Sequence, residues 1–495
     1  MKQVTEIWSL YENGVRRHRQ MGLQSDVEQA YRFFEGEQWW GLESKENLPI
    51  YNLIAPTVKY KVANVAMNQV EIYFSALCGS ERAQSLTKAL NRTAQMWWER
   101  LGMDTLCWRA LKESAIAGES YLYIYNDRGD CQLIDSTDIF LGDETQPDIQ
   151  RQPYLLLYER RAVGEVKKMA ESAGLGAEEI EKIISDSADS TLFSSRKNSS
   201  DDGKCGVLLY MYKDGQDIVF SRHTKYVSLG AEKRIEGLGV YPVVSLITGQ
   251  KKGSARGQGE VRPLIANQIE LNRNLARRII NSKMTAYSRL VYATDKIDNP
   301  EALGEVGSAI AVRDSSIADV HAAVGYVTPS PMSHDAKTIG DEMLQYTREL
   351  AGAGGALVGN IDPTQASGAA IIAVRDQAQI PLNENMALYR KFIEDIARVW
   401  YKLWVCYGLD TVNGENFTAI ELKGLRPLIR VDATSTTPFS KYAREQTLSA
   451  LLEKGMITLE EFALSLDDDS SVPKARLLQI VRQRKENIDA TTQIN

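Results

Sequence analysis

The sequence contains few of the residues, and none of the short motifs, that usually mark an enzyme. Only five cysteines and four histidines occur among its 495 residues. No Cys-x-x-Cys pair exists, and none of His18, His223, His321 and His334 lies at metal-ligand spacing from another histidine or a cysteine. We therefore expect no metal and no other cofactor. We also expect structural or exposed histidines, and buried free cysteines of the kind found in a reducing compartment.

Long apolar runs are missing as well. No stretch of about 18 or more consecutive apolar residues is present, so we expect no transmembrane helix. The first twenty residues, "MKQVTEIWSLYENGVRRHRQ", have no apolar core followed by a small-residue cleavage site. We therefore expect a short, partly charged helix there and no secretion signal.

A surplus of positive charge is also absent. The chain has 65 acidic and 58 basic residues, which gives a formal net charge of −7. Proteins that grip nucleic acid through its phosphates usually carry a basic patch. Either DNA is not a partner of this chain, or the chain binds DNA only weakly.

One glycine-rich stretch, "GSARGQGEVRPLIANQIELNRNLARRII" at residues 253–280, raises the question of a nucleotide site. It lacks the Lys-Ser/Thr pair of a P-loop, and Arg262 stands where the third glycine of a dinucleotide fingerprint should be, after Gly257 and Gly259. No G-x-S-x-G or H-E-x-x-H motif occurs elsewhere. We expect a turn that enters a long helix and no catalysis. A nucleotide-binding enzyme that uses the Gly253–Gly259 turn stays as the alternative.

Hydrophobic periodicity indicates an α+β protein. The pattern is helical over 83–122, with a helix end at Gly118, and strand-rich over 131–250 with one helical insert. After Pro263 a helix is expected to continue to about Ala286. Short strands should follow, including "SRLVYATD", "SAIAVRD" and "VGYVTPS", and then the helix "DAKTIGDEMLQYTREL". In the tail, "FTAIELKG" and "RPLIRVD" are predicted to be strands. Helices should come after them, one opened by a Thr458–Glu461 capping box.

Beyond Pro381, which should kink or break a helix, the apolar residues form a heptad-like seam. The seam consists of Leu382, Met386, Tyr389, Ile393, Ile396, Trp400 and Leu403. Two interpretations stay open: a coiled-coil dimer, or a helix buried in a larger assembly. We favour the second, because Phe392, Val399 and Trp404 widen the stripe.

Four sequence segments, in this order, resemble the portal proteins of tailed double-stranded DNA bacteriophages, in the SPP1-like branch. They are "YRFFEGEQWW" with "NLPIYNLIAPTV", then "SAIAGESYLYIY", then "GQGEVRPLIANQIELNRNLAR", and last "ASGAAIIAVRDQAQIPLNENMALYRKFIEDIARVW". Each segment is a loose match, and their order makes the resemblance specific. Together they cover roughly residues 25 to 465.

The resemblance implies a portal fold that assembles as a ring. Its parts would be a wing (1–250 and 408–440), a first stem helix with the turn leading into it (251–287), a small β clip (288–334), a second stem helix (335–351), a tunnel loop (352–366), a kinked long helix (367–407), and a helical crown and tail (441–495).

The same resemblance implies a function. The ring, usually a homododecamer, would sit at one capsid vertex of the virion as the channel for DNA packaging and genome ejection, after assembly in the host cytoplasm. Its partners would be double-stranded DNA, the terminase large subunit that supplies the ATPase, head-completion and adaptor proteins, and the major capsid and scaffolding proteins. No membrane and no catalysis of its own are implied. A non-portal ring or adaptor is a further alternative, although adaptors are generally much shorter.

The resemblance also suggests residues for particular roles. They are Asn360, Asp362, Thr364 and Gln365 in the tunnel loop, Lys337 and Glu342 as channel-lining stem residues, and Asp314 and Asp319 as clip contacts for terminase or adaptor. A plain surface loop is the alternative for the tunnel loop. The arginines between Arg273 and Arg278 could make weak contacts with DNA or salt bridges between subunits.

Elementary energetics agree with a ring. A lone helix with one apolar stripe cannot bury that stripe in a monomer, and burial is worth about 25 cal/mol per Å². A closed ring supplies an identical neighbour on both sides. The acidic balance fits too, because carboxylates that face a channel repel phosphate and leave DNA free to slide.

Overall fold

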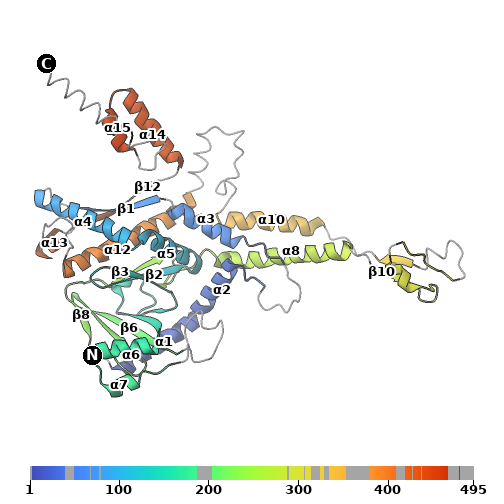
Figure 1. Ribbon diagram of the computed structural model, residues 1–495, viewed down its shortest axis with the longest axis horizontal. Helices are drawn as coiled ribbons and strands as arrows, with labels where there is room; N and C mark the ends of the chain where they lie inside the picture. The colour runs from blue at the N-terminus through green and yellow to red at the C-terminus, as the bar shows by residue number, and fades with distance from the viewer. Residues whose placement is uncertain are drawn as a thin grey trace. The chain divides into compact units, whose positions relative to one another are not determined.

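The fold is α+β, and the chain divides into two compact units. The computed structural model describes residues 3–39, 49–66, 68–76, 80–186, 203–286, 289–305, 307–313, 324–327, 334–352, 380–408, 419–425, 427–435 and 438–466, with Arg476 and Gln479. Unit 1 comprises Met1–Tyr31, Val58–Glu260 and Gly355–Asn495, and unit 2 comprises Arg32–Thr57 and Val261–Gly354. The chain passes between the units within α2 (Leu23–Glu35) and α3 (Ile54–Ala66) (Figure 1).

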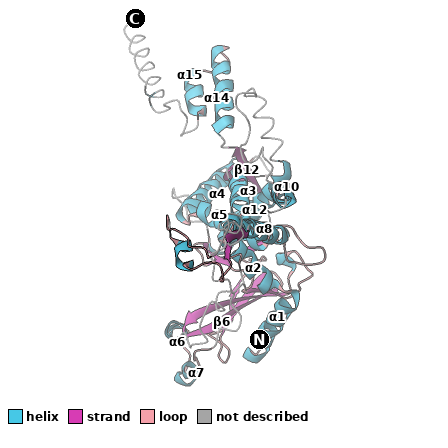
Figure 2. Ribbon diagram, turned by 90° about the vertical axis from the view of Figure 1, so that its right-hand side faces the viewer, coloured by secondary structure: helices cyan, strands magenta, loops and turns pink. Residues whose placement is uncertain are grey.

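The larger sheet of unit 1 is a five-stranded antiparallel meander in the order β4-β5-β6-β7-β8. Its strands are β4 (Ile139–Leu141), β5 (Tyr154–Ala162), β6 (Lys204–Asp214), β7 (Asp217–His223) and β8 (Lys233–Ile235). The N-terminal helix α1 (Val4–Met21) packs on this sheet (Figure 2). The Tyr11 ring stacks on Tyr158 with 5.0 Å between centroids and meets Phe140 edge-on at 5.1 Å. The helix predicted at the N-terminus is thus confirmed, and its apolar face completes the sheet's core.

A smaller sheet of unit 1, in the order β3-β2-β9, lies against helices. Its strands are β2 (Glu119–Tyr125), β3 (Asp130–Ile134) and β9 (Val243–Ile247). Helix α5 (Met103–Ala117) runs directly into β2 at Gly118, as predicted. The helical pattern over 83–122 is broken earlier as well. Helix α4 (Glu81–Arg100) ends before Gly102, whose φ of 60° reverses the chain into α5.

Three tryptophans form the centre of unit 1. Trp97 of α4 meets Trp400 and Trp404 of α12 (Asn383–Tyr407) edge-on, with centroids 5.6 and 5.2 Å apart. All three side chains are fully buried. Aromatic side chains of this size bury the most apolar area per residue, so this cluster dominates the packing of α4 against α12.

The heptad-like seam of α12 is covered by this chain itself. Six of its seven residues are buried and Met386 is partly buried, and the widening residues Phe392, Val399 and Trp404 are buried too. The coiled-coil interpretation is therefore wrong. A larger assembly is not needed to bury the seam either, because the aromatic core of unit 1 already does so.

Two strand predictions and one helix prediction need correction. The segment "FTAIELKG" was expected to be a strand, but α13 (Ala419–Leu425) is a helix whose Leu422 is buried, with its backbone carbonyl accepting from the Tyr401 hydroxyl. In "SAIAVRD" only Val312 pairs, through a single bridge to Ile297. The strand-rich region contains two helices, α6 (Val163–Ser172) and α7 (Ala177–Glu181), where one was expected.

The C-terminal elements β12 (Leu428–Ser435), α14 (Pro438–Glu453) and α15 (Leu459–Ser465) follow the predicted pattern, whereas the partner strand β1 (Asn68–Ser75) was not predicted. Strand β12 pairs antiparallel with β1 across the full length of both. The Thr458 hydroxyl accepts from the Glu461 amide, and the Glu461 carboxylate accepts from the Thr458 amide, which confirms the capping box.

Unit 2 is built from two helices with a hairpin between them in the chain. Helix α8 (Ile265–Ala286) ends at Ala286, as predicted, and is followed by β10 (Arg289–Tyr292), β11 (Val324–Val327) and α10 (His334–Leu350). Strands β10 and β11 pair antiparallel, from Arg289 opposite Val327 to Tyr292 opposite Val324. Both stem-helix positions expected from the sequence are therefore helical.

Four of the five cysteines lie in the described residues, and all four are free thiols. Cys107 and Cys205 are buried, as expected, whereas Cys131 and Cys406 are partly exposed. Burial raises the pKa of Cys205 to about 11 and that of Cys131 to about 12, so these thiols are unreactive near neutral pH. Across the described ranges, no helix combines the length and the apolar character that a membrane crossing requires.

Candidate functional site

The two helices of unit 2 form the candidate assembly surface. Helices α8 and α10 run side by side (Figure 1). They meet closely at Gly340, where an added Cβ would lie 2.9 Å from Asn274 Oδ1. The end of the Asn274 side chain would have to shift to admit a small side chain at position 340, and a large one would press on α8.

The first half of α8 is fixed by a buried network of side-chain amides. Gln268 accepts from the Leu53 backbone amide at 3.1 Å and donates to the Tyr51 carbonyl at 2.7 Å. Asn272, one turn later, accepts from the Tyr51 amide at 3.0 Å and donates to Gln38 at 2.6 Å. Gln268 and Asn272 therefore satisfy an extended segment of backbone much as a neighbouring strand would, and they anchor this half of the helix.

The second half of α8 and one face of α10 are uncovered. Past Ala276 no residue of α8 is buried, and Ile280 and Met284 are exposed. On α10, Ile339, Tyr346 and Leu350 are 50%, 60% and 62% exposed. Their spacing of seven and four residues places them within one narrow stripe of the helix. We call these three side chains the α10 stripe. It is large, apolar and unpartnered within the described chain.

The hairpin of β10 and β11 also exposes apolar side chains. Val291, Tyr326 and Val327 are all exposed, and β10 and β11 pair only with each other among the described strands. Each strand therefore has one edge that no other described strand pairs with. Such edges favour pairing with another chain.

Of the residues proposed for the tunnel loop, the channel-lining stem positions and the clip, Lys337 and Glu342 lie in the described part. Both are exposed on α10. Five residues on a helix correspond to about 140° around its axis, so the two side chains do not share a face. Glu342 flanks the α10 stripe, and Lys337 lies on the opposite side. The predicted residues Asp314, Asp319, Asn360, Asp362, Thr364 and Gln365 lie outside the described residues.

For the α8 arginines, contact with DNA and salt bridges between subunits both stay predictions, and the structure adds one intrahelical contact of Arg273. Its guanidinium pairs with Glu270 of the same helix at 2.6 Å, and both side chains are about half exposed. A pair of this kind, one turn apart on an exposed helix face, stabilises the helix by only a few tenths of a kcal/mol. Arg273 is thus engaged within its own subunit.

The Gly253–Gly259 turn, the alternative nucleotide site, is packed against the end of α5. An added Cβ on Gly257 would lie 2.1 Å from the Gly118 carbonyl oxygen, and one on Gly259 would lie 2.0 Å from the Ile116 oxygen. The Gln258 amide donates to the Thr248 carbonyl, and the Glu260 amide to the Ala115 carbonyl. The glycines are required for this close approach of two backbones, and these amides are already used.

The side chain of Arg256 projects from the same turn into the interior of unit 1. Its Nη1 donates to Glu119 at 3.0 Å, and its Nε and Nη2 donate to the two oxygens of Glu144 at 2.8 and 2.9 Å. Nη2 also lies 2.8 Å from His18 Nε2 of α1. The Arg256 residue is only 2% exposed, so this buried cluster joins α1, β2 and the turn through one guanidinium.

The protonation of the cluster follows from its geometry. Burial is the main cause that lowers the pKa of His18, and the nearby Arg256 charge acts in the same direction. A neutral His18 can then accept from Arg256. Although burial opposes ionisation of Glu144, the hydrogen bonds and the positive charge of Arg256 hold the pKa of Glu144 at about 2. The cluster thus pairs a fixed cation with a fixed anion in the core.

Sequence patterns did not predict this cluster. One signal was present: Glu119 opens an otherwise apolar strand, "ESYLYIY", and an inward-pointing carboxylate there needs a buried cation. The arginine that provides it lies 137 positions later in the chain, so no local pattern links the two.

No family model and no curated protein matches this sequence. A chain of a solved structure described as "Virion of native gene transfer agent (GTA) particle" is similar, with a TM-score of 0.41 and 12% sequence identity, over 89% of this chain and 94% of that chain. A likeness at this level falls short of a shared fold, so the proposal below rests on the residues of this chain.

Proposed function

We propose that this chain is a phage portal protein of the SPP1-like branch, which forms a closed ring of identical subunits at a capsid vertex. The observation that carries the proposal is the α10 stripe. Its three large side chains are at least half exposed, whereas the apolar seam of α12 in the same chain is buried. A helix that leaves such a stripe in water lacks a partner, and a ring supplies one to every subunit.

Two further features of unit 2 support the ring. The exposed end of α8 adds Ile280 and Met284 to the uncovered apolar surface. The hairpin has one edge on each side that no other strand in the described ranges pairs with. A head-to-tail ring needs two different adhesive surfaces on each subunit, and the two edges of one hairpin meet that need.

In this proposal the helices of unit 2 surround a DNA channel. Glu342 flanks the α10 stripe, whereas Lys337 lies about 140° away around the helix, so the two do not both point at the channel axis. We assign Glu342 to the edge of the subunit contact and Lys337 to the channel. The tunnel loop, clip, wing and crown, and contacts with terminase, head-completion, capsid and scaffolding proteins, belong to the proposal as the resemblance implies them.

We propose no catalytic role for the chain. The competing proposal, a nucleotide-binding enzyme, would need the Gly253–Gly259 turn to cradle phosphates. That turn packs its glycines against α5, and its arginine is held by Glu119 and Glu144. A phosphate would have to displace these buried contacts, so we regard the enzyme as the weaker candidate.

The test is electron microscopy of the purified full chain in negative stain. We expect ring-shaped particles with a central hole. The triple substitution Ile339→Ser, Tyr346→Ser and Leu350→Ser should abolish the rings, because it removes the stripe without touching a buried side chain. Asp341→Ser, an exposed change on the same helix, is the matched control and should leave the rings intact. Compact single particles from the unchanged chain at every concentration would overturn the proposal.

A further inference from the structure

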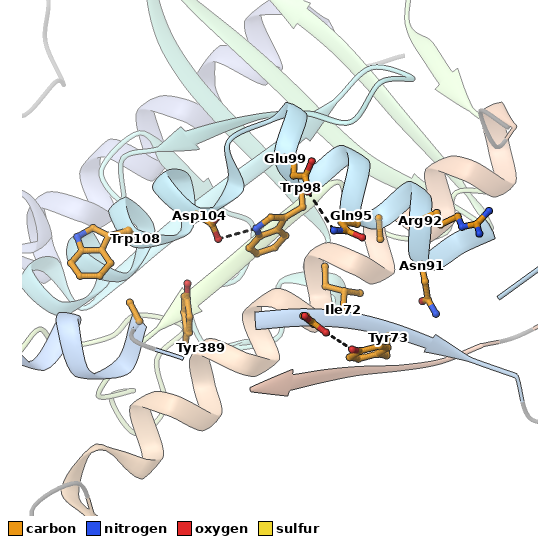
Figure 3. A pocket seen from close by; sticks show the side chains of 13 residues that line it. Ile72, Tyr73, Asn91, Arg92, Gln95, Trp98, Glu99, Asp104, Trp108 and Tyr389 are labelled. Atoms are coloured by element: carbon orange, nitrogen blue, oxygen red, sulfur yellow. Dashed lines mark hydrogen bonds between the residues drawn. The ribbon is translucent and has the colours of Figure 1, made fainter. Parts of the chain in front are cut away.

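Unit 1 contains an open pocket that the proposed function does not use. Its volume is about 570 Å³. It is lined by α4, α5, β1 and the start of α12 (Figure 3). On α4, residues 91, 94, 95 and 98 recur at helical spacing and therefore face the same way. The pocket is large enough for a side chain together with its neighbours in a peptide.

Aromatic rings form much of the lining. Trp98 and Trp108 come from α4 and α5, Tyr73 from β1 and Tyr389 from α12. Trp98 is held in place, because it meets the core ring of Trp400 edge-on and its indole nitrogen donates to Asp104 at 2.9 Å. Trp108 is 42% exposed, which is unusual for so large an apolar side chain without a partner.

Carboxylates accompany these rings. Glu71, Glu99 and Asp104 line the pocket, against a single arginine, Arg92, so the formal charge of the lining is −2. Within the described chain each of the three carboxylates accepts a hydrogen bond from a neutral donor: the Tyr73 hydroxyl for Glu71, the Gln95 amide for Glu99 and the Trp98 indole for Asp104. None of the three forms an ion pair with a described lysine or arginine. The pocket therefore attracts a cation and repels a phosphate.

The combination of flat rings and carboxylates favours one kind of cation. A guanidinium group is planar, stacks on tryptophan and donates in a fork to carboxylates, whereas an ammonium does only part of this. Figure 3 shows the Trp98 indole directed at Asp104, with Tyr389 and Trp108 on the same side of the pocket. We propose that this pocket binds an arginine side chain presented by a partner polypeptide.

A polypeptide fits better than a free small cation. The volume exceeds what one guanidinium fills, and the exposed rings of Tyr73 and Trp108 extend the apolar surface past the carboxylates. These rings can cover the aliphatic stem of the arginine and the residues beside it. Arginine next to aromatic side chains is a common energetic centre of protein interfaces. The inference does not depend on the ring proposal, because all residues named belong to unit 1.

The test titrates the full chain with an acetylated leucyl-arginyl-leucine amide and follows tryptophan fluorescence. We expect a saturable change in fluorescence. The affinity for the peptide should fall as the salt concentration is raised. The citrulline analogue, which keeps the shape and removes the charge, should bind at least tenfold more weakly. Trp108→Leu should weaken binding about two- to fivefold, as expected for one lost cation–π contact at a partly exposed site.

Charge-removing variants complete the experiment. The pair Glu99→Gln and Asp104→Asn should weaken binding on the order of tenfold, since each retains its hydrogen-bond acceptor and loses its charge. Glu178→Gln on α7, exposed and outside the pocket, is the control and should bind as the unchanged chain does. Equal binding of arginine and citrulline peptides, or unaltered binding by the pocket variants, would overturn the proposal.

Two other occupants of the pocket, a small cation and a second copy of this chain, are recognised by different results. If acetyl-argininamide binds as tightly as the tripeptide, the site takes a small cation and the polypeptide assignment is wrong. If acrylamide quenching of Trp108 falls as protein concentration rises with no peptide present, a second copy of this chain covers the pocket. In either case the partner proposed here is rejected, whatever the outcome of the ring experiment.

Discussion

Helices α12 and α10 both carry apolar stripes, but the α12 seam is buried within the described chain and the α10 stripe is exposed. In unit 1 the α12 seam is enclosed by α4 and the sheets, with Trp97, Trp400 and Trp404 at its centre. In unit 2 the α10 stripe is exposed, and among the α10 residues whose burial the structure describes only Gly340 and Thr347 are buried. An amphipathic pattern therefore predicts that one face of a helix is buried, but it does not tell whether the same chain or another chain covers that face. The apolar seam of α12 is buried within the described chain, and in the ring that we propose a neighbouring subunit would cover the α10 stripe.

The largest expected effect comes from the buried cluster that makes unit 1 self-sufficient. Arg256→Ala leaves Glu119 and Glu144 as buried carboxylates without their cation, which should cost about 3–5 kcal/mol of unfolding free energy. Chemical denaturation of the full chain measures this loss of unfolding free energy. Arg151→Ala, which removes an exposed arginine paired with Asp148, should change the same quantity by less than about 0.5 kcal/mol. Comparable losses in both variants would contradict the role given to the cluster.

A second effect, also in unit 1, depends on pH. Burial, and to a lesser extent Asp135, raise the pKa of Asp138 to about 7, and its Oδ1 has no hydrogen-bond partner. A carboxyl whose folded pKa is raised destabilises the fold as pH rises from its unfolded pKa, near 4, to its folded pKa. Asp138→Asn removes this penalty. Relative to the unchanged chain, the variant should therefore gain about 2 kcal/mol between pH 5 and pH 8.

Denaturation of both proteins at pH 5, 6.5 and 8 measures this gain. Asp127→Asn, at an exposed position, serves as the control and should give a difference that hardly varies with pH. A gain for Asp138→Asn that shrinks as pH rises would show that the carboxyl is stabilised in its charged form.

A smaller effect is expected where the two helices of unit 2 touch. Gly340→Leu places a side chain against Asn274 and should weaken the packing of α8 on α10 by about 1–3 kcal/mol. The weaker packing should be measured as faster hydrogen exchange of the α10 backbone amides. Gln345→Leu, on the exposed side of α10, should leave exchange nearly unchanged, because glutamine and leucine have similar helix propensities.

The smallest effect is expected in the α10 stripe of the isolated chain. Tyr346→Ser removes an exposed side chain, so the unfolding free energy of a single subunit should change by no more than about 0.5 kcal/mol. A loss of several kcal/mol in dilute, unassembled protein would mean that Tyr346 is already packed within its own chain. The comparison between α10 and α12 would then fail.

The sequence predicted the elements better than their environments. The end of α8 at Ala286, the junction at Gly118 and the Thr458 capping box depend on local patterns and agree with the structure. The helix α13 was mistaken for a strand, because "FTAIELKG" alternates apolar and polar residues and the burial of Leu422 against distant residues decides its form. Period alone cannot resolve so short a segment.

The candidate sites divide in the same way. The glycines of the 253–259 turn were visible in the sequence, but their reason, contact with the carbonyls of Ile116 and Gly118, is a tertiary one. The pocket at Trp98 and Trp108 is lined by residues between Ala66 and Tyr389 in the chain, so no local spacing reveals it. Lys337 and Glu342 could be proposed from the sequence, and only helix geometry separates their directions.

Hydrogen exchange of the full chain, compared between assembled and strongly diluted protein, tests the central claim most directly. We predict that amides of residues 334–350 are protected in the assembled sample and exchange quickly after dilution, while those of residues 383–407 stay equally protected in both. Protection of residues 334–350 that does not depend on assembly would show that α10 needs no neighbouring subunit, and would contradict the account.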